Sequence, residues 1–320
     1  MAQSKIVRQN FSSNNIRQKQ DEAQIRAIVE DNQNENVVNA SKVFENSEND
    51  YATSVMGIKS DPVLISEVCK LPSKGIPYGK ALGDSIELRA MTTVEERMRL
   101  SGENFWSTMS NIMNRCLVNS DFDTKNLVDF DFFAALVKLR VVTYGQNYKV
   151  SSTCLKCGSK QDFNVDLDEV KISELPDDFE EPIKIGPMPR SGDILGIRFL
   201  RVFDHIAITN AVNEYKQKNS SNKLGSPDYT MEMERMLVSV NGRELDSMAK
   251  KLYIEKMTGM DSSYFHKEIE KLFYGVHRVG VKTCGEDECE GLMIYQIAPD
   301  SEFFRTSFDN WWHKSKSPIV

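Results

Sequence analysis

Six cysteines occur in the 320-residue chain, and four of them form two closely spaced pairs. Cys154 and Cys157 are separated by two residues and are followed by Gly158, whereas Cys284 and Cys289 are separated by four. Thiolates two to four residues apart in a tight turn can bind one metal ion, and two such turns supply the four sulfurs of a closed tetrahedral site. The spacing therefore predicts a zinc site with the ligands Cys154, Cys157, Cys284 and Cys289.

Each cysteine pair lies between stretches that have the composition of short strands. These stretches are residues 147–153, 161–167, 278–283 and 291–297. Two hairpins with cysteines in their turns form a zinc ribbon. Gly158 supports this interpretation, because such turns often need a positive φ, which only glycine adopts without steric cost. A site filled by four sulfurs holds structure and leaves no position for a catalytic water.

Other interpretations of these residues remain open. In one alternative, the four cysteines are ordinary thiols in two turns and bind no metal. In another, His277, which precedes the second pair, replaces one cysteine as a ligand, although a core or surface role is commoner for a lone histidine. Disulfides are disfavoured, because the sequence shows no signal peptide or long apolar span and we expect a reducing compartment. Cys69 and Cys116 lie at apolar positions and are expected to be buried small hydrophobic side chains.

The rest of the sequence predicts a protein of the α+β class, in which the ribbon joins two units of mixed helix and strand. A polar arm, residues 1–60, comes first and is too poor in apolar residues to fold alone. The first unit, residues 61–175, ends in the first cysteine hairpin. An acidic, proline-bearing linker follows at residues 176–190, and the second unit, residues 191–302, ends in the second hairpin.

Apolar residues recur three and four positions apart in several segments, which is typical of amphipathic helices. One helix start is marked by Thr92 and Glu95, which have the spacing of a capping box. The charged residues of the third helix, among them Asp131 and Arg140, are expected on its solvent side. Helices are predicted near residues 92–101, 103–116, 124–144, 204–215, 228–240, 245–257 and 262–273.

A shared metal ion would have a consequence for the whole chain. One ion bound by both pairs would close residues 158–283 into a loop and tie the end of the first unit to the end of the second. Loss of the ion is therefore expected to loosen the relation of the two units.

The chain ends in an aromatic segment, residues 303–320, with five aromatic residues within ten positions. These are Phe303, Phe304, Phe308, Trp311 and Trp312. Packing on the chain's own core is the simplest expectation, because aromatic side chains bury large areas. Docking on another subunit is the competing hypothesis, since Trp and Phe are enriched in interfaces.

Charge and motifs limit the function. The chain carries 47 acidic and 40 basic residues, a formal net charge of −7, which disfavours a protein that depends on phosphate contacts. The alternative function is that of a zinc-ribbon protein that binds nucleic acid or acts as a regulator, and such a protein would need a basic face. The sequence contains no phosphate loop, nucleophile elbow, HExxH pair or dinucleotide fingerprint, so we expect a non-enzymatic protein.

The order of four motifs resembles a known family. The motifs are Leu71-Pro72-Ser73-Lys74-Gly75, the strand 86–91 running into Thr92-Thr93-Val94-Glu95-Glu96, the helix end 139–145, and Cys154-Leu155-Lys156-Cys157-Gly158. Together they resemble the baseplate hub and hub-assembly proteins of T-even-like contractile-tailed bacteriophages, over roughly residues 68–205 and more loosely to Phe304.

The resemblance implies a non-enzymatic structural or assembly protein of the phage tail, scaffolded by a structural zinc. It implies a place in the virion baseplate after assembly in the host cytoplasm. The expected partners are other tail and baseplate proteins, contacted through residues 1–60 and residues 303–312, with a homo-oligomer as a further possibility. Neither a nucleic acid partner nor a membrane segment is expected.

Overall fold

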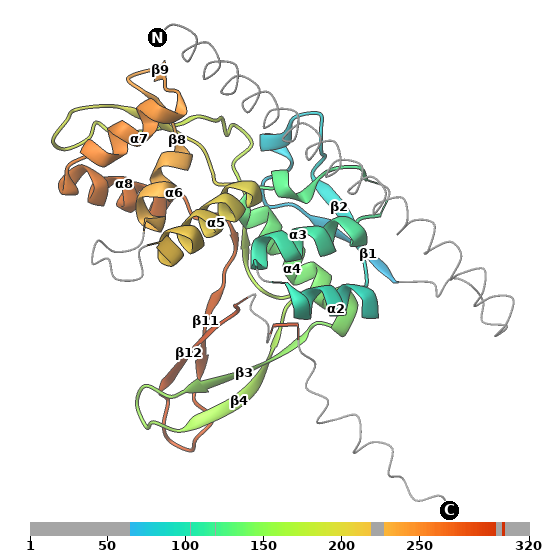
Figure 1. Cartoon of the computed structure of the whole chain (residues 1–320). Helices are drawn as coiled ribbons and strands as arrows, with labels where there is room; N and C mark the ends of the chain where they lie inside the picture. The colour runs from blue at the N-terminus through green and yellow to red at the C-terminus, as the bar shows by residue number, and fades with distance from the viewer. Residues whose placement is uncertain (1–64, 103, 119, 219–226, 299–302, 305–320) are drawn as a thin grey trace, which may run out of the picture. The chain divides into compact units, whose positions relative to one another are not determined.

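The computed structural model describes residues 65–102, 104–118, 120–218, 227–298 and 303–304 (Figure 1). The chain divides into two units, Met1–Leu64 and Ile65–Val320, and all described residues belong to the second. The predicted polar arm, residues 1–60, lies outside the described residues. The described part contains seven α-helices and several small antiparallel sheets, which confirms the expected mixture of helix and strand.

The larger hydrophobic core surrounds α4 (Asp129–Tyr144), which is buried along most of its length. The hairpin of β1 (Ser66–Lys70) and β2 (Ser85–Arg89) contacts α4, as does α3 (Phe105–Cys116), and α2 (Thr93–Ser101) packs on α3. α2 begins at the predicted capping box. The hydroxyl of Thr92 accepts the Val94 amide at 3.3 Å, and the carboxylate of Glu95 accepts the Thr92 amide at 2.8 Å.

The expectation that the charged residues of α4 face solvent is wrong for two of them, because Asp131 and Arg140 are buried. Asp131 accepts hydrogen bonds from the Ser73 amide at 2.8 Å, the Tyr78 hydroxyl at 2.6 Å and the Ser73 hydroxyl. Arg140 donates to three backbone carbonyls, those of residues 145, 147 and 303, at 2.6 to 3.1 Å. These bonds offset part of the cost of burying the two groups.

The helix predicted over residues 124–144 is divided by a tertiary contact. A short 3-10 helix, η2 (Thr124–Asn126), ends before α4 starts. Between them the Val128 amide donates to the Tyr78 hydroxyl at 2.9 Å, and Val128 forms an isolated bridge with Arg201. Residue 128 is therefore extended, and α4 begins one residue later.

The second hydrophobic core lies between a four-stranded sheet and three helices. The strand order is β6 (Ile183–Ile185), β7 (Leu195–Ile197), β8 (Leu237–Val240), β9 (Arg243–Glu244), all antiparallel. The helices are α6 (Asp228–Met236), α7 (Ser247–Lys256) and α8 (Gly259–Lys271). α5 (Val202–Lys218) contacts α3 of the first core and α6 of the second.

Two predicted segments differ from what the structure shows in this region. The helix predicted over residues 228–240 ends at Met236, because Leu237–Val240 pair with β7 and alternate between buried and partly exposed. The predicted linker, residues 176–190, contains β6 and places Ile185 and Met188 in the second core. That stretch is packed, and its prolines mark turns around a strand.

Phe303 and Phe304 are fully buried in the larger core. Their rings form an edge contact at 5.1 Å, and Phe303 also meets Tyr148 at 5.2 Å. The expected packing on the chain's own core is thus confirmed for these two residues, while residues 305–320 lie outside the described part.

Candidate metal centre

Two hairpins carry the four paired cysteines, as the sequence predicts (Figure 1). The first consists of β3 (Asn147–Thr153) and β4 (Lys160–Asp166), and the second of β11 (Val279–Thr283) and β12 (Leu292–Gln296). They lie side by side at their cysteine ends, where Cys154 and Met293 form an isolated bridge. The Leu155 amide also donates to the Leu292 carbonyl at 3.0 Å.

This arrangement brings the four cysteine sulfurs together from two distant parts of the chain. The Sγ atoms of Cys154, Cys157, Cys284 and Cys289 all lie within 4.8 Å of one another. Cys154 and Cys289 are 3.7 Å apart, and so are Cys157 and Cys284. Three of the four side chains are buried, and Cys157 is exposed.

The sulfur geometry fits a tetrahedral metal ion. A zinc–sulfur bond of about 2.3 Å places the sulfurs of a regular tetrahedron about 3.8 Å apart, close to the two shortest separations found here. The same 3.7 Å separations are far longer than a disulfide bond of about 2.05 Å, so these cysteines are not paired covalently. Four thiolates in a tetrahedron suit zinc or an iron–sulfur centre.

Backbone amides turn toward the sulfurs and favour their ionised form. The Lys156 amide donates to Cys154 at 3.4 Å, and the Glu286 amide donates to Cys284 at 3.5 Å. Amides of Cys157 and Lys156 lower the pKa of Cys154 to about 6. The Ser159 amide lowers the pKa of Cys157, but the neighbouring sulfurs of Cys289 and Cys154 outweigh it and raise that pKa to about 12. A divalent cation would relieve this repulsion between adjacent thiolates.

Two side chains that the sequence analysis did not single out hold the turns in place. Gln161 donates to the Cys284 sulfur at 3.4 Å and accepts the Gly285 amide at 3.0 Å, so it connects the first hairpin to the second. Lys156 donates to the Cys289 carbonyl at 2.6 Å. Such outer contacts orient metal ligands. No local pattern marks them, because their partners lie more than 120 residues away.

Two glycines shape the cysteine turns. Gly158 has a φ of 75°, which confirms the predicted need for a positive φ after Cys157. Gly291 is required for space: a Cβ there would lie 2.4 Å from the Cys154 sulfur and 3.1 Å from the Cys289 sulfur. The sequence signal for it is a glycine two residues after a cysteine, which by itself is too common to be recognised.

The remaining candidate ligands lie away from the cluster. His277 contacts the Ser173 hydroxyl at 2.8 Å and the ring of Phe273, so it is no substitute ligand. Cys69 and Cys116 are buried in the larger core, as predicted, and burial raises the pKa of each thiol to about 12. The structure therefore places the four predicted ligands together and separates the other two cysteines from them.

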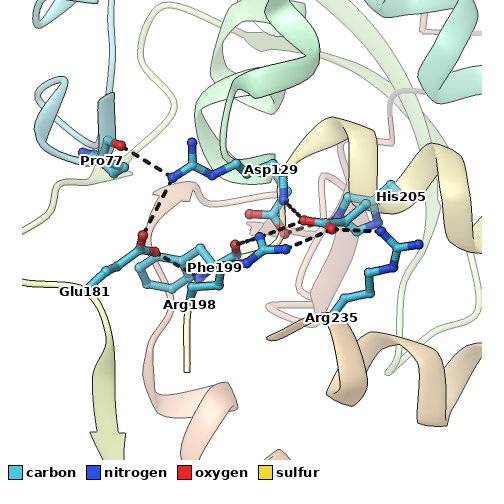
Figure 2. Close-up of polar contacts among 9 residues, drawn as sticks. Pro77, Asp129, Glu181, Arg198, Phe199, His205 and Arg235 are labelled. Atoms are coloured by element: carbon cyan, nitrogen blue, oxygen red, sulfur yellow. Dashed lines mark hydrogen bonds and ion pairs between the residues drawn. The ribbon is translucent and has the colours of Figure 1, made fainter. Parts of the chain in front are cut away.

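Polar contacts also connect the two hydrophobic cores, around the start of α5 (Figure 2). Arg198 donates two hydrogen bonds to the buried carboxylate of Asp204, at 2.7 and 2.9 Å. Arg235 of α6 lies 3.4 Å from the same carboxylate. Nearby, the Asp129 amide of α4 donates to the carbonyl of Leu200, a residue of the second core, at 3.0 Å.

A second ion pair belongs to this junction. Arg201 lies 3.7 Å from the Glu181 carboxylate and 3.4 Å from the Pro77 carbonyl (Figure 2). The predicted architecture, in which the cysteine ribbon joins the unit of residues 61–175 to the unit of residues 191–302, is thus incomplete. A polar junction connects the cores, and the hairpins form a separate small cluster around Met293 and Phe163.

A cavity of about 390 Å³ lies beside the junction, lined mainly by aromatic and aliphatic side chains. Its polar lining includes Asp129, which faces His205 at 3.5 Å, and Glu232, whose pKa is raised by burial. No serine, cysteine, threonine or lysine is among its lining residues in the described part of the chain. The described lining residues therefore offer the Asp129–His205 pair no serine or cysteine to activate.

The described helices include none that is both long and apolar enough to span a bilayer. The fold and site thus define a mixed α and β protein with a four-cysteine cluster across two hairpins. The family model for T4 bacteriophage base plate proteins matches residues 65–293, more than half of the chain, and the chain belongs to this family. Among curated proteins and among solved structures, no match to the chain was found.

Proposed function

We propose that this baseplate protein serves in the hub region of the tail, as a non-enzymatic structural or assembly component with one structural zinc ion. The family match carries the baseplate role and implies a place in the virion tail. The four-sulfur cluster supports the zinc, because its spacing suits a tetrahedral ion and all four positions are sulfur.

In this proposal zinc supplies rigidity and takes no part in a reaction. Cys154, Cys157, Cys284 and Cys289 hold it, and Gln161 and Lys156 orient the turns around it. A rigid pair of hairpins suits a protein that must present fixed surfaces to its neighbours in a large assembly.

The proposed partners are other tail and baseplate proteins, met after synthesis in the host cytoplasm. Residues 1–60 are the first candidate contact, because their composition suits a segment that orders on a partner. Of the second predicted contact, residues 303–312, Phe303 and Phe304 already fill the chain's own core. Homo-oligomer formation within the assembly remains part of the proposal.

The alternative function, a zinc ribbon that binds nucleic acid, has less support. The turn of the second cysteine hairpin carries four exposed carboxylates and no basic residue, namely Glu286, Asp287, Glu288 and Glu290. A ribbon that uses its tip on nucleic acid needs the opposite charge there.

Cross-linking mass spectrometry on purified tails of the phage that encodes the chain tests the proposal. Cross-links to central tail proteins would support a place in the hub region, and cross-links only to peripheral baseplate proteins would contradict it. Elemental analysis of the purified chain tests the zinc separately. We expect about one zinc per chain, and a metal-free protein purified without chelator would overturn that part.

A further inference from the structure

The hairpin of β11 and β12 has an exposed face without any charge. In an antiparallel pair, residues opposite one another point to the same side, and the outward set here is Val279, Val281, Thr283, Leu292, Ile294 and Gln296. The four apolar members are between 51% and 60% exposed. We call these six residues the apolar face.

The other hairpin provides an internal comparison. Its outward residues are all polar, and they include Lys149, Lys160, Asp162 and Asn164. Lys149 and Asp162 form an ion pair at 3.1 Å. An antiparallel sheet with one solvated side has polar residues on that side, as this hairpin does. The apolar face departs from that pattern, which indicates that another surface covers it.

The charge around the apolar face is asymmetric. At the base of the apolar face, the residue before β11 is Arg278. Its guanidinium lies over the Phe133 ring and is therefore already engaged by a residue of the larger core. At its tip stand the four exposed carboxylates of residues 286–290. A matching occupant therefore has apolar side chains over the strands and positive charge beyond their tip.

The chain's own C-terminal segment has this order. After Phe304 come Phe308, Trp311 and Trp312, followed by His313, Lys314 and Lys316. We propose that residues 305–320 bind the apolar face of the same chain, with the aromatic residues over Val281, Leu292 and Ile294. Lys314 and Lys316 then meet the acidic tip.

The tether makes this binding feasible. The ring of Phe303 meets Tyr148 of β3 at 5.2 Å, and Arg140 binds the carbonyls of both Phe303 and Asn147, so Phe303 lies at the base of the first hairpin, from which residues 305–320 are tethered. Sixteen extended residues reach up to roughly 55 Å, whereas a five-residue strand such as β11 rises only about 17 Å. A short tether also gives an effective concentration on the order of millimolar, which favours the same chain over a second copy.

Fluorine NMR of the full chain labelled with 5-fluorotryptophan tests the proposal. The chain has three tryptophans, so Trp311 and Trp312 report on the segment, and Trp106, stacked on His205 at 4.1 Å, reports on the fold. Single Trp→Phe variants assign the signals. We expect the Trp311 and Trp312 signals to lie away from their positions in urea, and Ile294→Lys to raise the released population at least tenfold. Val281→Thr, which adds no charge, should act in the same direction but less.

Asn164→Lys is the matched control, since it places the same side chain on the outward face of the other hairpin. It should leave all three signals unchanged. The replacement of Lys314 and Lys316 by Glu should increase release. Signals of Trp311 and Trp312 that already match the unfolded chain would overturn the proposal. Trp311 and Trp312 signals that change with neither Ile294→Lys nor Val281→Thr would also overturn it. So would signals that move to their unfolded positions on tenfold dilution, because that result would show that the segment binds a second copy of the chain.

Discussion

Replacement of one sulfur ligand tests how much of the structure depends on the metal. In Cys154→Ser the site loses a buried thiolate that has two amide hydrogen bonds. An ion shared by both pairs closes the chain from Cys157 to Cys284, and a cross-link over a loop of that length would stabilise the fold by about 5 kcal/mol. That figure treats the rest of the chain as free.

The structure reduces this estimate, because the larger core already holds the base of each hairpin. Val165 of the first hairpin and Val276 before the second are both buried there. The loop that the metal closes then runs from Val165 to Cys157 and from Cys284 to Val276, about 16 residues in all. The same dependence of loop-closure entropy on loop length gives a stabilisation of roughly 3 kcal/mol. We therefore expect Cys154→Ser to abolish stoichiometric zinc binding and to open the hairpin tips while the helical cores remain folded.

Elemental analysis and hydrogen exchange measure the two parts of this prediction. Amide exchange should accelerate in β3, β4, β11 and β12 and stay slow in α4. Cys69→Ala is the matched control, because this buried cysteine lies outside the cluster and should keep its zinc. The reasoning would be refuted if Cys154→Ser retained a full equivalent of zinc, or if α4 lost its protection together with the hairpins.

Three further changes test other contacts. Gly291→Ala should weaken zinc binding at least tenfold in a chelator competition, because its Cβ would lie 2.4 Å from the Cys154 sulfur; Gly285→Ala, whose nearest neighbour is the flexible Gln161 side chain at 3.2 Å, should have little effect. Burial raises the pKa of Asp131 to about 6, against hydrogen bonds from Ser73 and Tyr78 that lower it, so the stability it contributes below about pH 4 is lost as pH rises through 6. Asp131→Asn should remove this dependence. In urea titrations, the free energy of unfolding of the variant should therefore rise by up to about 2 kcal/mol relative to the wild type between pH 4.5 and pH 7.5, and an unchanged difference would contradict the assignment. Asp204→Ala should lower the free energy of unfolding in urea by about 3–5 kcal/mol, because it leaves Arg198 without its buried partner, whereas Glu214→Ala, which breaks an exposed pair with Lys218, should change it by less than about 1 kcal/mol.

The sequence predicts those features that depend on local spacing. The cysteine pairs, the positive φ of Gly158 and the capping box at Thr92 each lie within a few residues, and the structure contains all three. Features that depend on distant partners could not be predicted in this way. From the sequence alone, Asp131 has the pattern of a surface charge, because the residues that bind it in the structure, Ser73 and Tyr78, lie 58 and 53 residues away in the chain. The junction around Asp204 and the role of Gly291 are hidden for the same reason.

The hairpins show why this chain combines large cores with a metal site. Two strands alone are marginally stable in water, and beyond the larger core these hairpins bury little more than Met293 and three of their four cysteines. A cross-link at the tips constrains the free ends where no core supports them. The second hairpin has the greater need, since Glu288 and Glu290 both adopt positive φ, at 60° and 45°, which is unfavourable for residues with a Cβ. The two cysteine pairs therefore meet where two residues of the second turn have an unfavourable backbone conformation and only a small cluster of buried side chains supports them.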